Sequence, residues 1–159
     1  MNNWFQCNVR YEKTMENGML KKVAEPYLVD ALSFTEAEAR FIKEVSPFVT
    51  GEFTVSDIKR AKISEIFEDE TGDRWFKAKV QFVHLDEKSG AEKKVSCFML
   101  IQACDLRTAV ANLDKGMKET MADYVIYSIT ETPIMDIFPF DAEFTESHRE
   151  EYKDKNEES

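Results

Sequence analysis

The stretch "WFKAKVQFV" (residues 75–83) nearly repeats "WFQCNVRYE" (residues 4–12), and this pair of segments decides the fold. Each copy opens with Trp-Phe and then alternates apolar and polar residues. Successive side chains of a strand point to opposite faces of a sheet, so the alternation predicts a half-buried strand. The expected inner faces carry Phe5, Cys7 and Val9 in the first copy and Phe76, Ala78 and Val80 in the second.

Two further blocks repeat at nearly the same spacing. "KKV" occurs at 21–23 and again at 93–95. "FTVSDIKRAKISEIFED" (53–69) aligns with "YVIYSITETPIMDIFPF" (124–140). This alignment matches three Ile residues and one Phe residue, namely Ile58, Ile63, Ile66 and Phe67 with Ile129, Ile134, Ile137 and Phe138. Three matches in the same order along the chain indicate an internal duplication.

Each half has the element order β-β-α-β. Ser33 and Glu36 have the spacing of a helix capping box, as do Thr35 and Glu38, and Asp105 stands where the second helix should begin. The second strands are expected at 20–31 and 92–104, and the last strands at 53–67 and 124–138.

The expected fold class is α+β, with duplicated β-β-α-β units that form an antiparallel sheet with two helices and pseudo-two-fold symmetry. Residues 1–140 are expected to form a single duplicated domain, with repeats at 1–70 and 71–140. An acidic tail follows at 141–159.

The turn residues Thr71-Gly72-Asp73 predict a hairpin between 58–67 and 74–83. Such a hairpin would gather six cations of an acidic chain, and the alternation places both Trp side chains on the polar side of their strands. Aromatic rings beside cations can bind a nucleotide or single-stranded nucleic acid. The other interpretation is that the Trp residues cover the end of a core or pack under the tail, and that the lysines form an ordinary exposed strand face, because lysines also protect sheet edges. The candidate ligand-binding residues are Trp4, Arg10, Lys59, Arg60, Lys62, Arg74, Trp75, Lys77 and Lys79.

Nothing in the sequence has the spacing of a catalytic or metal-binding site. The two His and three Cys residues form no triad or metal motif, and the acidic turn at 68–73 lacks the pattern of a calcium loop. No glycine-rich phosphate loop is present. We therefore expect no enzyme activity, no cofactor and no metal.

Composition and charge favour a cytoplasmic protein. An odd number of cysteines without paired spacing is typical of reduced thiols, and the chain has neither a signal-peptide pattern nor a membrane-length apolar run. The net charge of −10 disfavours non-specific binding to nucleic acid or to an anionic membrane, but it leaves room for a local basic site.

The tail offers a second candidate surface. Phe144, His148 and Tyr152 have helical spacing and would form one apolar edge, so they are candidate partner-binding residues. The alternative is a solubilising terminus. Open sheet edges also make a homodimer an expectation.

The segments "WFQCNVRYE", "EPYLVDALSFTEAEAR" and "ISEIFEDETGDRWFKAKVQF" resemble a family of small bacterial and phage-borne proteins classed only as a domain of unknown function. The resemblance covers nearly all of residues 1–140, and its most distinctive part is "PYLVDALSFTEAEAR" (26–40). It implies a phage or mobile-element context and supplies no site residues.

These observations favour a non-enzymatic accessory protein that binds a host protein or a nucleotide-like anion, with a host protein preferred. A single-stranded nucleic-acid-binding protein is the alternative. A metal-dependent hydrolase that uses the acidic turn ranks last.

Overall fold

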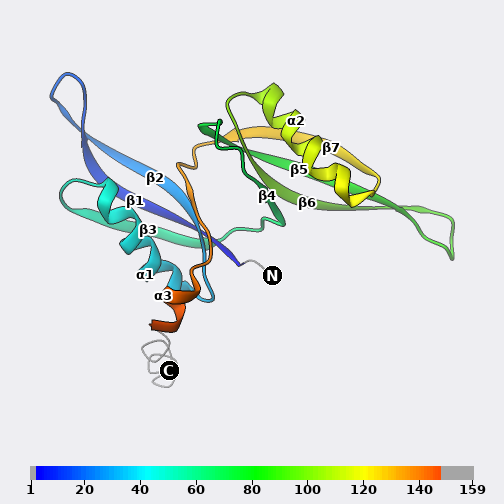
Figure 1. Ribbon diagram of the computed structural model, residues 1–159, viewed down its shortest axis with the longest axis horizontal. Helices are drawn as coiled ribbons and strands as arrows, with labels where there is room; N and C mark the ends of the chain where they lie inside the picture. Colours follow the sequence, from blue (N-terminus) through cyan, green and yellow to red (C-terminus); the bar gives the residue numbers. More distant parts are fainter. Residues whose placement is uncertain (1–2, 148–159) are drawn as a thin grey trace. The chain divides into compact units, whose positions relative to one another are not determined.

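The computed structural model describes residues 3–147, which form two compact units (Figure 1). Within the described residues, one unit contains positions 3–61 and 134–147, and the other contains Lys62–Pro133. The chain therefore passes from one unit to the other twice. No helix of the described residues is long and apolar enough to cross a membrane.

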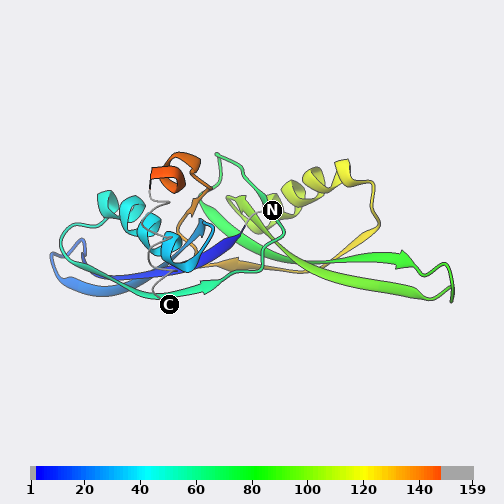
Figure 2. The same ribbon diagram turned by 90° about the horizontal axis from the view of Figure 1, so that it is seen from below.

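The first unit is a four-stranded sheet with its helix on one face (Figure 2). Its strand order is β3-β1-β2-β8. The β1–β2 and β1–β3 pairs are antiparallel, whereas β2 and β8 are parallel. Its elements are β1 (Trp4–Thr14), β2 (Leu20–Asp30), α1 (Phe34–Val45), η1 (Ser46–Phe48), β3 (Phe53–Arg60), β8 (Ile137–Phe138) and α3 (Ala142–Ser147).

The second unit has the same design. Its strand order is β4-β6-β5-β7, with antiparallel β5–β6 and β5–β7 pairs and a parallel β4–β6 pair. Its elements are β4 (Glu65–Phe67), β5 (Arg74–Leu85), β6 (Glu92–Ala103), α2 (Leu106–Met117), η2 (Lys118–Thr120) and β7 (Tyr124–Thr132).

Each helix packs on the apolar face that the alternation predicts. Phe5 and Val9 of β1 are fully buried with Phe41 of α1 in one core cluster. Val80 of β5 and Leu113 of α2 are fully buried in the other. A fully buried apolar side chain of this size contributes about 1.5–3 kcal/mol, so these two layers supply much of the driving force for folding.

The expected helix starts are confirmed. The Ser33 hydroxyl accepts a hydrogen bond from the Glu36 amide at 3.1 Å, and the Glu36 carboxylate accepts one from the Leu32 amide at 2.7 Å. The Asp105 carboxylate accepts from the Thr108 amide at 2.7 Å. Amides of the first helical turn have no partner within the helix, so these side chains satisfy groups that would otherwise depend on water.

The last strand of each repeat does not remain in its own sheet. The expected strand 53–67 breaks into β3 and β4, and β4 joins the second sheet beside β6. The expected strand 124–138 breaks into β7 and β8, and β8 joins the first sheet beside β2. The two repeats thus exchange their final strands.

This exchange overturns the predicted hairpin of 58–67 with 74–83. In the second sheet β6 lies between β4 and β5, so the strands on either side of the Thr71-Gly72-Asp73 turn do not pair with each other. Gly72 packs closely here, because a Cβ atom on it would lie 2.5 Å from Ala103 Cα.

The α+β class and the repeated element order are confirmed, but the strands form two sheets instead of one. Pairing partners match between repeats: Ile66 pairs with Leu100 as Ile137 pairs with Leu28. The β1–β3 and β5–β7 ladders also share an irregularity at the same place, at Asn8/Val9 and at Lys79/Val80. Matched registers and bulges support the duplication.

Candidate ligand-binding face

The basic cluster predicted from sequence is divided between the two units. Lys59 and Arg60 lie on β3, which pairs with β1 of the first unit. Lys62 is the first residue of the second unit, which also holds Lys77 and Lys79 on β5. The prediction failed because it required β5 to pair with the segment before it.

The two arginines at the strand ends have local partners. The Arg60 guanidinium donates to the Asn3 side-chain oxygen at 2.9 Å and lies over the ring of Phe5, 5.3 Å from its centroid. The Arg74 guanidinium forms an ion pair with Glu131 at 3.7 Å. Both therefore serve local packing and pairing within their sheets.

Neither indole is available for stacking. Trp4 is only 6% exposed and Trp75 only 3%. Both occupy the strand positions that alternate with the helix-packed residues, as the sequence predicted, and neither belongs to a helix-packed core cluster. Burial therefore contradicts the ligand-stacking hypothesis for these two rings and agrees with the alternative that strand-edge Trp residues are covered, because strand alternation specifies a face and not what covers it.

Lys77 and Lys79 instead lie over rings from the neighbouring strands. The Lys77 ammonium is 4.6 Å from the centroid of the Phe98 ring on β6, and the Lys79 ammonium is 4.6 Å from that of Tyr127 on β7. Both distances are within the range of cation–π attraction. Tyr127 is 64% exposed. We call this group the lysine face; its members are Lys77, Lys79, Phe98 and Tyr127, with Ser128 and Thr130 beside them.

The described strand residues that share the lysine face carry no negative charge. The residues paired with Lys77 are Leu100 and Thr130, and those paired with Lys79 are Phe98 and Ser128. Among the described residues that alternate onto this face between positions 75 and 83 and on the paired parts of β6 and β7, none is acidic. The two ammonium groups therefore create a local positive potential on an acidic protein.

The first repeat has no such face at the same register. Gln6 and Asn8 occupy the positions that correspond to Lys77 and Lys79, and they pair with Lys59 and Asp57 on β3. The duplicated scaffold thus tolerates neutral residues at these positions, and the lysine pair is a property of the second repeat alone.

Arg10, the remaining basic candidate, borders a groove of about 1120 Å³ in the first unit. The groove lies between the end of the β1–β2 hairpin and residues 48–54, and its charged lining residues are of both signs. Tyr11 also lines it and donates a hydrogen bond to the Glu25 carboxylate. Burial and this carboxylate raise the pKa of Tyr11 to about 12, so its hydroxyl is protonated at neutral pH.

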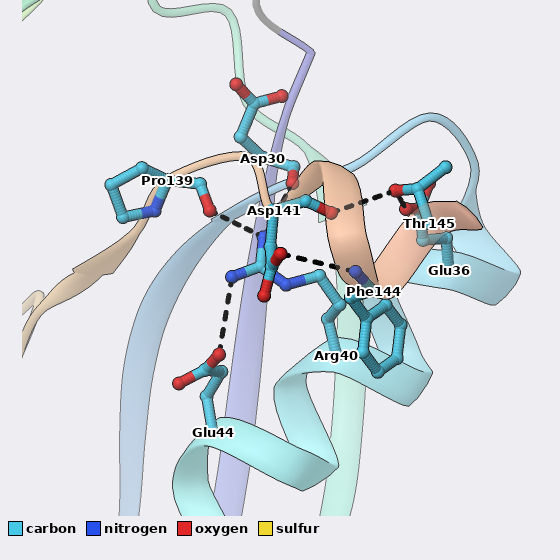
Figure 3. A network of polar contacts seen from close by, with 8 residues as sticks. All are labelled: Asp30, Glu36, Arg40, Glu44, Pro139, Asp141, Phe144 and Thr145. Carbon is cyan, nitrogen blue, oxygen red and sulfur yellow. Dashed lines mark hydrogen bonds and ion pairs between the residues drawn. The ribbon is translucent and has the colours of Figure 1, made fainter. Parts of the chain in front are cut away.

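A buried polar network anchors the C-terminal segment to α1 (Figure 3). Arg40 is 3% exposed and donates to the backbone oxygens of Asp30 at 3.0 Å and Pro139 at 2.6 Å. The Glu36 carboxylate, also buried, accepts a hydrogen bond from the Thr145 hydroxyl. Because unsatisfied buried polar groups are costly, these bonds hold the segment after β8 against the helix.

Phe144 belongs to this anchored segment. Its side chain is 6% exposed, and the Lys43 ammonium lies 5.2 Å from its ring centroid. The expectation that it forms an exposed apolar edge is therefore wrong. His148 and Tyr152, the other two residues of that prediction, lie outside the described residues.

The second repeat has a neutral counterpart of the Arg40 contact. The Asn112 amide donates to the Gln102 backbone oxygen at 3.0 Å and to the Asp69 carboxylate at 2.9 Å. Hydrogen bonds from Thr71 and Asn112 lower the pKa of Asp69. Both helices therefore bind the end of the second strand and the segment that follows the exchanged strand, which marks these contacts as part of the scaffold.

The described residues contain no cluster of three or more His, Cys, Asp or Glu side chains that could hold a metal ion. Burial, together with the charges of Glu38 and Asp57, raises the pKa of the Cys7 thiol to about 12. A thiol with such a pKa is not a nucleophile at neutral pH.

Comparison with known proteins assigns the chain to a sequence family. A family model described as a domain of unknown function (DUF4494) matches residues 3–140. The chain belongs to this family. Searches of curated proteins and of solved structures gave no match. DUF4494 membership therefore agrees with the resemblance of residues 1–140, and the chemistry of this member has to be argued from its own side chains.

Proposed function

We propose that this DUF4494 protein is a non-enzymatic, cytoplasmic accessory protein of a phage or mobile element that binds a nucleotide-like anion through its lysine face. The observation that carries the proposal is the pairing of Lys77 with Phe98 and of Lys79 with Tyr127, on a face where the described residues of the three paired strands include no carboxylate. The phage or mobile-element context comes from the sequence resemblance alone.

The arrangement suits a ligand that combines phosphate with a flat base. Alternate residues of a strand are about 7 Å apart, so two lysines on one strand can attract neighbouring phosphates of a chain. The exposed Tyr127 ring offers a stacking surface, and such stacking contributes about 1–3 kcal/mol per base. Single-stranded nucleic acid supplies both groups repeatedly and is the polymeric form of this ligand.

The test replaces the two lysines with the residues of the first repeat, as Lys77→Gln with Lys79→Asn. We expect this variant to lose affinity for a labelled thymidine oligonucleotide in fluorescence anisotropy at low salt. Each lost phosphate contact should lower the slope of log K against log salt by about 0.7, so the slope should fall by about 1.4.

Lys21→Gln with Lys22→Gln is the matched control, because it removes the same charge from exposed positions of β2. A nucleoside triphosphate and heparin serve as competitors that distinguish a single nucleotide and bare charge from a nucleic-acid chain. Equal losses in both double variants, or no binding by the wild type at low salt, would contradict the proposal.

A further inference from the structure

The two repeats differ most in the strands at the open edges of their sheets. β3 is an edge of the first sheet and β7 is the corresponding edge of the second. An edge strand leaves alternate backbone N–H and C=O groups without a partner, and proteins protect such edges with charge. β3 carries this protection, since Asp57, Lys59 and Arg60 fall within its eight residues.

β7 lacks the charges of β3 at the same register. Ser128 of β7 occupies the position that corresponds to Asp57 of β3, and it pairs with Lys79. Thr130 occupies the position that corresponds to Lys59, and it pairs with Lys77. The one ionised side chain of β7, Glu131, forms the ion pair with Arg74 of its own sheet. Both edges have the same bulge, so the bulge does not compensate for the missing charge on β7.

Exposed apolar residues replace polar ones along the same edge. Met121 is 95% exposed, Val125 52% and Tyr127 64%. The first repeat has Thr50, Thr54 and Ser56 at the corresponding positions. Exposed apolar residues that gather beside an unprotected edge are typical of an interaction surface.

We propose that β7 is a dimerisation edge, at which a second copy of this chain adds its own β7 antiparallel to form one continuous eight-stranded sheet. A two-fold axis brings an edge against itself with residue i of one copy opposite residue j of the other, so a charged edge can pair only in registers that avoid like charges. A nearly uncharged strand with apolar Val125 and Tyr127 suits self-pairing without this restriction, whereas Asp57, Lys59 and Arg60 limit the registers in which β3 could pair with itself. The proposal is independent of ligand binding and can be tested without a ligand.

A two-fold axis perpendicular to the sheet keeps equivalent faces on the same side. The lysine faces of both copies then lie on one surface of the continuous sheet. If both proposals hold, the dimer presents two sets of lysines to one ligand, which favours a nucleic-acid chain over a single nucleotide.

Sedimentation of the whole protein at increasing concentration tests the dimer. We expect the wild type to sediment as a dimer and the Val125→Glu variant as a monomer, because it places a carboxylate on the edge. Thr54→Glu makes the same change at the matching position of β3 and should leave the dimer intact. A wild-type monomer at every concentration, or equal effects of the two variants, would overturn the proposal.

Hydrogen exchange on the unmodified protein gives a second measurement. Amide protection of residues 124–132 should increase with protein concentration, whereas that of residues 53–60 should not. If the exchange of both strands does not depend on protein concentration, the proposal is overturned. The same result is expected if β7 pairs with an extended peptide of another protein instead of with a second copy.

Discussion

At the scale of single residues, the same position can serve different purposes in the two repeats. Asn8 and Lys79 occupy equivalent places in the bulged ladders, yet only Lys79 lies over an exposed aromatic ring. The sequence identified Lys77 and Lys79 but missed Phe98 and Tyr127. Their alignment with the lysines depends on the pairing of three strands, which a single segment does not reveal.

Phe98→Leu tests the contribution of ring stacking to binding. Leu keeps an apolar side chain but removes the aromatic surface beside Lys77. We expect oligonucleotide affinity to fall by about 5- to 150-fold, as for the loss of one stacked base, while the salt dependence stays that of the wild type. Phe82→Leu makes the same change on the helix-packed side of the hairpin. A reduced salt slope for Phe98→Leu would argue against a stacking role.

At the scale of elements, local signals were sufficient for helices and hairpins. The Ser33 and Asp105 caps lie where the sequence placed them, and the four long strands of the two hairpins were expected within a few residues of their observed ends. The final strands were not predicted correctly, because no local pattern in 53–67 or 124–138 indicates that the chain leaves one sheet and enters the other. An apolar strand segment satisfies its hydrogen bonds equally well beside any open edge.

The Asp105 cap should make helix α2 sensitive to acid. Asp105→Ala removes the acceptor for the Thr108 amide and should lower the free energy of unfolding measured by urea denaturation near neutral pH. The hydrogen bonds from Thr108 lower the pKa of Asp105. Its stabilisation is therefore fully present above about pH 4, the unfolded value, and is lost as the pH falls through the lower folded pKa.

Asp105→Ser is the matched control for the acid effect, because serine caps the equivalent helix of the first repeat without titrating. The difference in free energy of unfolding between Asp105→Ser and Asp105→Ala should persist in acid. The difference between the wild type and Asp105→Ala should become smaller in acid. If the wild-type difference is the same at both pH values, the carboxylate does not act as the cap.

At the scale of the whole molecule, the exchange of β4 and β8 makes the repeats mutually dependent. Each sheet obtains its fourth strand from the other repeat, and parallel pairs at Leu28 and Leu100 complete the two sheets. A single repeat therefore supplies three of the four strands of its sheet, and the fourth strand comes from the other repeat.

Separating the repeats should expose this dependence. We expect residues 1–70 and 71–159, produced as separate chains, each to be unstable or self-associated, because each lacks its exchanged strand. Mixed together, they should form a one-to-one complex with the circular dichroism of the intact protein. If the two chains are stable, folded monomers that do not associate with each other, the strand exchange is not needed for folding.

The sequence by itself determined the duplication, the element order, the apolar faces of the long strands and the helix caps, because strand periodicity and capping act between residues close along the chain. Only the tertiary structure decided which edge β4 and β8 join, that Trp4 and Trp75 are buried, and which rings lie beside Lys77 and Lys79. Those features depend on contacts between distant segments, and an alternating strand has the same local pattern whichever neighbour it pairs with.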